Sequence, residues 1–182
     1  GDYLEFGCHR ARTFRFALRE AIIKNMQMNF HAFDSFKGLP DHGNNDKQNT
    51  WHLKGLLSTS DKNFKKMISS FTKYKKVKLY KGFYEDTLNN SLVSKFKKKK
   101  IIASLINIDC DLEKSVSSSL NFALKFIQDG TILYIDDYYD TYKGHPKKGV
   151  PLVVNKLLKK YNILSEPWYN AAGCGKSYLL YK

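Results

Sequence analysis

The chain has 182 residues, of which 42% are hydrophobic and 14% are aromatic. This length suits one domain with a core of its own, and the aromatic content excludes a disordered chain. No apolar run is long enough to span a membrane. The three cysteines are widely spaced, so they predict neither a disulfide framework nor a zinc site. We therefore expect a cytoplasmic protein with reduced thiols. The formal net charge is +14, and 27 of the 31 basic residues are lysine, a bias that coding composition produces as readily as a nucleic-acid or membrane surface does.

Apolar patterns typical of strands and helices alternate along the whole chain. Strands are predicted at residues 3–6, 30–34, 77–80, 101–108 and 131–135, with the last two at 163–164 and 177–181. Amphipathic helices are predicted at about 13–26, 61–73, 85–96, 116–127 and 150–158. Residues 101–108 form a near-continuous apolar run, and no repeat or linker divides the chain. We therefore expect a single domain over residues 1–182, an α/β fold with a doubly wound, mostly parallel sheet and helices on both faces.

Acidic residues gather where the predicted strands end. Eight of the 17 acidic residues lie there: Glu5, Asp34, Glu85, Asp86, Asp109, Asp111, Asp136 and Asp137. Helix N-caps would account for one or two of them, such as Asp86 and Asp111. Three others, Asp109, Asp136 and Asp137, follow neighbouring strands, and clustered carboxylates repel one another unless a cation or a raised pKa compensates. Oxygen-only ligands favour Mg²⁺, Mn²⁺ or Ca²⁺ over zinc, so this trio is a candidate metal site.

The turn after the first strand indicates a nucleoside ligand. Its sequence, E-F-G-C-H-R-A-R-T, is not the G-x-G-x-x-G of a dinucleotide site, although Gly7 still lets the backbone approach a ligand closely. Asp34 ends the second strand, where a carboxylate accepts hydrogen bonds from ribose hydroxyls. This combination suits a nucleoside without a pyrophosphate, such as S-adenosylmethionine. The G-C-G-K-S segment at 173–177 is not a P-loop, because Asn170 stands where that motif needs glycine and a strand follows.

Five stretches together resemble a known family. They are D-Y-L-E-F-G (2–7), F-D-S-F-K-G-L-P (33–40), K-G-F-Y-E-D-T-L (81–88), I-D-C-D-L (108–112) and I-D-D-Y-Y-D (135–140). With them the sequence resembles class I S-adenosylmethionine-dependent methyltransferases, and within these the macrocin O-methyltransferase family of sugar-modifying enzymes. The resemblance implies a seven-stranded Rossmann-like sheet. It also implies an N-terminal segment that covers the active site, which would precede Gly1. Ala11 and Glu113 stand where the family commonly has glycine and tyrosine.

The resemblance also implies roles for individual residues. Glu5 and Gly7 would contact the methionine part of the cofactor, Asp34 and Ser35 the ribose, and Gly82 and Phe83 the adenine. Asp109, Asp136 and Asp137 would hold the metal, and Asp111 would act as general base with Asp109 as the second catalytic residue.

The expected reaction is methyl transfer from S-adenosylmethionine to a sugar hydroxyl of a glycoside, polysaccharide precursor or natural product. A divalent cation such as Mg²⁺ would lower the pKa of that hydroxyl, and Asp111 would take its proton. His145 is either a second base or a surface histidine. Four aromatics, Tyr138, Tyr139, Trp168 and Tyr169, would either stack on a sugar or pack within the protein.

Two other functions remain open at this stage, an RNA or other nucleic-acid methyltransferase and a non-catalytic fragment of a methyltransferase fold. The lysine-rich segments at 75–78, 95–100 and 159–160 precede strands, so we expect them at the edge opposite the cofactor. A basic surface there argues against nucleic acid as substrate, although it could contact a membrane or an acidic partner. A homo-oligomer also remains open.

Overall fold

The computed structural model describes residues 1–41, 53–140, 142–171 and 173–182. The strands are β1 (Asp2–Phe6), β2 (Phe30–Asp34), β3 (Val77–Lys81), β4 (Ala103–Ile108), β5 (Ile127–Ile135), β6 (Leu164–Ala171) and β7 (Gly175–Tyr181). The α-helices are α1 (Arg12–Ile23), α2 (Asp61–Ile68), α3 (Tyr84–Thr87), α4 (Asn90–Lys98), α5 (Glu113–Ala123) and α6 (Gly149–Lys160), and short 3₁₀ turns lie at Leu124–Phe126 and Tyr142–Gly144. No helix in these ranges is both long and apolar enough to cross a membrane.

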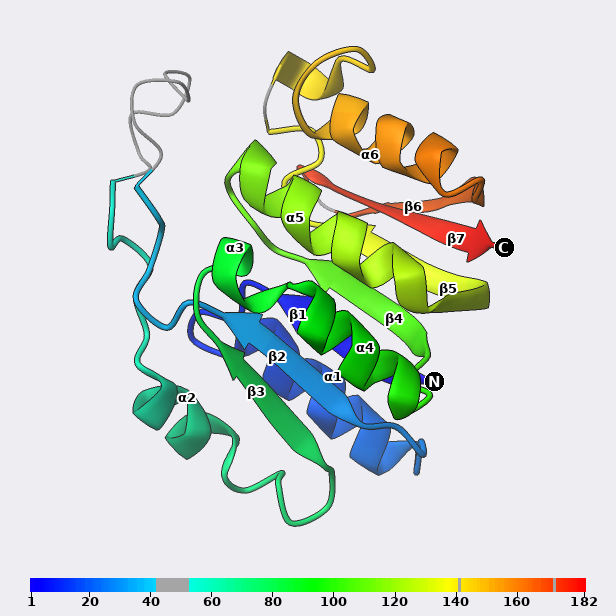
Figure 1. Ribbon diagram of the computed structural model, residues 1–182. Helices are drawn as coiled ribbons and strands as arrows, with labels where there is room; N and C mark the ends of the chain where they lie inside the picture. Colours follow the sequence, from blue (N-terminus) through cyan, green and yellow to red (C-terminus); the bar gives the residue numbers. More distant parts are fainter. Residues whose placement is uncertain (42–52, 141, 172) are drawn as a thin grey trace.

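All seven strands form one sheet in the order β3-β2-β1-β4-β5-β7-β6. Neighbours from β3 to β5 are parallel, and β7 runs antiparallel to both β5 and β6. The predicted mostly parallel, doubly wound sheet is therefore confirmed. The parallel strands end together at one edge, which we call the carboxyl edge, and begin together at the opposite, amino edge (Figure 1).

Helices cover both faces of the sheet, as predicted. On one face α4, α5 and α6 lie over the strands, and the side chains of Phe96, Leu120 and Val154 join the larger core there (Figure 1). On the other face α1 packs through Phe14 and Leu18, one helical turn apart, into the smaller core. Alternate residues of β1 divide between the two cores, which is why this strand is buried along its whole length.

Several predicted elements differ from the structure, and among them the helix expected at 61–73 ends at Ile68. The helix expected at 85–96 is two helices, because the side chain of Asn89 accepts a hydrogen bond from the Leu92 backbone and starts α4 afresh. The helix expected to reach residue 127 ends at Ala123, and β5 begins at Ile127. The strand expected at 163–164 extends to Ala171 and contains Pro167, which is tolerated because β6 is an edge strand.

Candidate active site

The first loop brings the backbone of β1 against that of β4. Gly7 has a φ of 82°, and a Cβ there would lie 1.8 Å from the carbonyl oxygen of Asp109, so only glycine fits. Ala11, which precedes α1, also has a left-handed conformation with φ 55°. The glycine that the family commonly has at this position would adopt that conformation without strain, so the substitution affects the backbone of this loop.

Asp34, at the end of β2, connects the loop after β1 to the loop after β2 through hydrogen bonds. Its Oδ2 accepts hydrogen bonds from the backbone N–H groups of Cys8 at 2.8 Å and His9 at 3.0 Å, and its Oδ1 accepts one from Phe36 at 2.6 Å. The hydroxyl of Ser35 donates to the Gly38 carbonyl at 2.7 Å and so shapes the second loop. Both residues thus build the wall of a pocket before any ligand is considered.

This pocket opens at the carboxyl edge between β1, β2, β3 and β4. Seven residues predicted for the site line it: Gly7, Asp34, Ser35, Gly82, Phe83, Asp109 and Asp111. The sequence reasoning missed other lining residues, among them His9, Tyr84, Cys110 and Ser115. His9 is held by a 2.6 Å hydrogen bond between its Nδ1 and the Leu57 carbonyl, a contact across 48 residues that no local pattern signals.

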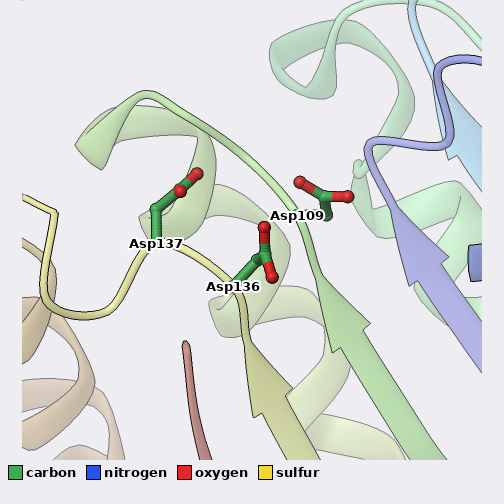
Figure 2. Close-up of side chains that lie close together, drawn as sticks. All are labelled: Asp109, Asp136 and Asp137. Carbon is green, nitrogen blue, oxygen red and sulfur yellow. The ribbon is translucent and has the colours of Figure 1, made fainter. Parts of the chain in front are cut away.

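The three aspartates predicted to bind metal converge beside this pocket. One carboxylate oxygen of each of Asp109, Asp136 and Asp137 lies within 4.8 Å of the other two. Asp109 follows β4 and Asp136 follows the neighbouring β5, so the parallel pairing of these strands places them next to each other (Figure 2). Because all the donors are carboxylate oxygens, the residues fit a hard divalent cation such as Mg²⁺.

The electrostatics of the trio favour a bound cation. Burial, followed by the nearby charges of Asp136, Asp137 and Asp111, raises the pKa of Asp109 to about 7. Burial, followed by the charges of Asp111, Asp136 and Asp140, likewise raises the pKa of Asp137 to about 7. Gathering these carboxylates costs free energy that a cation would offset.

Tyr134 orients one member of the trio, and sequence reasoning missed it. Its hydroxyl donates a 2.7 Å hydrogen bond to Oδ1 of Asp136. Gly175 makes room for this hydroxyl, since a Cβ at that position would lie 2.3 Å from the oxygen. The second glycine of the G-C-G-K-S segment therefore has a packing role. The only local signal in the sequence is that Tyr134 and Asp136 lie two residues apart at the end of β5.

The suggestion that Asp86 and Asp111 cap helices is wrong. Phe83 and Leu112 occupy the N-cap positions of α3 and α5, and neither end has a side-chain cap. Asp111 instead lines the pocket, and its charge raises the pKa of both Asp109 and Asp137.

Glu5 is buried within the sheet. Only 1% of it is exposed, and its Oε2 accepts a hydrogen bond from the hydroxyl of Tyr3. Burial raises the pKa of Glu5 to about 8, so the carboxyl is protonated at neutral pH. It does not line the pocket, and its contact with the methionine part of a cofactor stays a prediction.

Other candidates from the sequence lie outside the pocket wall. His145 is exposed, and its Nδ1 accepts a hydrogen bond from the Lys147 backbone in a turn, as a surface histidine would. Tyr138 is 5% exposed and packs against Tyr139 and Tyr178, which favours packing over sugar stacking for this residue. Trp168 is 57% exposed and could still contact an acceptor.

Comparisons with known proteins identify the family and agree with the fold. The model of the macrocin O-methyltransferase (TylF) family matches residues 1–147. The search of curated proteins gave no match. Among solved structures, the O-methyltransferase NovP has a TM-score of 0.81 at 18% identity, covering 100% of this chain and 72% of NovP. The calicheamicin methyltransferase CalS11 has a TM-score of 0.78 at 16% identity, covering 98% of this chain and 72% of CalS11.

A third structure, TomG from Streptomyces achromogenes, has a TM-score of 0.57 at 11% identity and covers 100% of this chain and 73% of TomG. These likenesses show a shared fold, and the family match spans most of the chain. The protein therefore belongs to the macrocin O-methyltransferase family and is an O-methyltransferase of that type.

Proposed function

We propose that this protein transfers a methyl group from S-adenosylmethionine to a sugar hydroxyl, assisted by a divalent cation. The observation that carries the proposal is the convergence of Asp109, Asp136 and Asp137 beside a pocket at the carboxyl edge. Family membership supports the methyl transfer. The structural neighbour TomG is described in complex with S-adenosylmethionine, which supports the choice of cofactor.

The pocket residues would bind and orient the cofactor. Asp34 would accept hydrogen bonds from the ribose, and Gly82 and Phe83, at the start of α3, would flank the adenine. Gly7 keeps the first loop close to β4, so its backbone could approach the methionine part. When bound, the cofactor supplies an electrophilic methyl group, and the main task of the protein is to align an acceptor oxygen with it.

The acidic cluster would prepare the acceptor. Asp109, Asp136 and Asp137 would hold a divalent cation, which supplies Lewis acidity that favours deprotonation of a neighbouring hydroxyl. Asp111 lines the same pocket and would accept the proton. Asp109 lines the pocket and also belongs to the trio. It would therefore lie between the bound cofactor and the metal, and its catalytic role would be to hold the metal next to the cofactor.

A sugar is the acceptor class that the comparisons favour. CalS11 is described as a TDP-rhamnose 3'-O-methyltransferase, and its fold covers nearly the whole of this chain. The hydroxyl oxygens of a sugar would also suit a hard divalent cation, which prefers oxygen donors. A nucleic-acid acceptor is less well supported, because the lysine-rich segments lie at the amino edge, opposite the pocket.

Methyl transfer from tritium-labelled S-adenosylmethionine to a panel of sugar nucleotides and glycosides tests the proposal. Transfer should stop in EDTA and return when Mg²⁺ is added. Asp136→Asn should abolish the Mg²⁺-dependent transfer, whereas Asp129→Asn, at the amino edge, should leave it unchanged. Full turnover in EDTA would contradict the role of the metal, and transfer to RNA but to no sugar would contradict the acceptor class.

A further inference from the structure

A second pocket, at the amino edge, is lined by lysines. Four of them contribute to its wall, namely Lys76, Lys78, Lys99 and Lys100. They come from two separate segments, one entering β3 and the other entering β4, and all four are exposed. The acidic residue in this wall, Asp2, is 9% exposed and holds His31 Nε2 at 2.9 Å and the Asn29 amides at 2.9 and 3.0 Å. Its charge is therefore already compensated inside the protein.

The positive surface continues beyond this pocket. Partial burial, followed by the nearby charges of Lys160 and Lys97, lowers the pKa of Lys125. These three lysines come from the ends of α6 and α4 and from the turn before β5. Like charges thus converge along the amino edge, and an anionic partner would relieve their repulsion.

Exposed apolar side chains at this edge also have lysines next to them. Met26, Tyr74 and Ile102 are 45%, 61% and 43% exposed. Ile102 belongs to the wall of the lysine pocket, and Lys75 Nζ donates a hydrogen bond to the Met26 carbonyl. The ammonium of Lys73 lies 4.9 Å from the centre of the Tyr74 ring. Each apolar group therefore has a lysine beside it.

We propose that the amino edge docks on the surface of a membrane that contains anionic lipids. The ammonium groups of the lysines attract the anionic headgroups, and the long methylene chains of these lysines let the charges reach the membrane interface. The neighbouring apolar side chains would insert into this interface. Nucleic acid fits less well, because its readers use arginine, and the four arginines of this chain all lie between residues 10 and 19. A purely polar polyanion would also gain nothing from Met26, Tyr74 and Ile102.

Docking in this way would turn the carboxyl edge away from the membrane. The candidate active site would then remain open to acceptors arriving from solution, since the two pockets lie at opposite ends of the parallel strands. The inference does not depend on the proposed function, because membrane binding is measured without methyl transfer.

Co-sedimentation with lipid vesicles tests the inference. The protein should bind vesicles of phosphatidylcholine mixed with phosphatidylglycerol and should not bind phosphatidylcholine alone. Binding should weaken strongly as NaCl rises from about 0.1 M to about 0.5 M, since salt screens exposed charges. A quadruple variant, K76Q/K78Q/K99Q/K100Q, should bind at least 100-fold more weakly, at about fivefold for each lysine.

Matched variants separate this surface from overall charge and from polyanion binding. A control with the same change in charge, K37Q/K54Q/K143Q/K147Q, lies away from the amino edge and should lose less than about threefold. The pair Tyr74→Gln and Ile102→Gln should weaken vesicle binding several-fold and leave its salt dependence unchanged. Thermal melting of each variant checks that it is folded.

Three outcomes would overturn the inference. The first is that, at low salt, the protein binds both types of vesicle equally well or binds neither of them. Another is an equal loss of binding in the two quadruple variants, which would show that net charge alone matters. The third is tight, amino-edge-dependent binding to homopolymeric RNA without vesicle binding, which would assign this edge to nucleic acid.

Discussion

The two edges of the sheet hold opposite charges in opposite environments. At the carboxyl edge, partly buried carboxylates converge, and burial together with neighbouring negative charges raises the pKa of Asp109 and of Asp137. At the amino edge, lysines such as Lys76 and Lys99 stand exposed around an open pocket. Water screens the second group well and the first group poorly. The net charge of +14 reflects the lysines, whereas the proposed chemistry depends on the less numerous acidic residues.

The difference shows where this fold tolerates an unfavourable arrangement. Gathering partly buried carboxylates weakens the folded state, and such an arrangement persists where a bound ligand offsets its cost. Exposed lysines cost little free energy, so substitutions of single lysines change the stability of the fold only slightly. We therefore expect substitutions at the carboxyl edge to change stability or activity strongly, and substitutions of exposed lysines at the amino edge to change surface binding alone.

Paired glycine substitutions should give the largest difference between the edges. Gly7→Ala places a Cβ 1.8 Å from the Asp109 carbonyl at φ 82°, and it should lower the free energy of unfolding by more than about 4 kcal/mol. Gly130, at the amino edge, has φ 79° and open space around it, so Gly130→Ala should cost about 1 kcal/mol. Urea unfolding of both variants measures the contrast, and similar losses would contradict it.

Asp109→Asn should separate function from stability. It removes one member of the trio, so methyl transfer in Mg²⁺ should fall at least 100-fold, about 2.7 kcal/mol of transition-state stabilisation. The metal-free variant should melt at or above the temperature of the parent chain, because a repelling charge is gone. A loss of activity that merely followed a lower melting temperature would count against a metal-binding role.

Glu5→Gln should flatten the dependence of stability on pH. The folded-state pKa of about 8 exceeds the usual carboxyl value, so between about pH 5 and 8 the folded chain keeps a proton that the unfolded chain has lost. Stability contributed by this group is complete at low pH and falls as pH rises, by up to about 1.4 kcal/mol per unit. Chemical unfolding at several pH values measures this slope, with the exposed Glu166→Gln as control. Parallel profiles for Glu5→Gln and the parent chain would contradict the burial of a protonated carboxyl.

Neutralising the amino edge should have the smallest effect on folding and catalysis. The double variant K76Q/K78Q should change the free energy of unfolding by less than about 0.5 kcal/mol, because both side chains are exposed. Its rate of methyl transfer to a small soluble acceptor should match that of the parent chain. A clear fall in that rate would mean that the two edges are coupled.

Much of the site could be predicted because parallel strands end together. The proximity of Asp109 and Asp136 could be predicted once their two strands were expected to be parallel neighbours. The contact between Tyr134 and Gly175 depends on the antiparallel pairing of β5 with β7, and no local pattern signals that register. For the same reason the sequence did not predict that His9 lines the pocket, because its hydrogen-bond partner Leu57 is distant in sequence. Asn89 divided a predicted helix through a single side-chain hydrogen bond, which the apolar periodicity does not report.

Calorimetric titration of the protein with S-adenosylhomocysteine, in the presence of Mg²⁺, tests the proposed cofactor pocket most directly. We expect one binding site per chain, and we expect Asp34→Ala to weaken binding at least tenfold, because Asp34 orders both loops of the pocket. Asp129→Asn should bind like the parent chain. Failure of the folded parent chain to bind S-adenosylhomocysteine at millimolar concentration would contradict the assignment of the carboxyl-edge pocket to the cofactor.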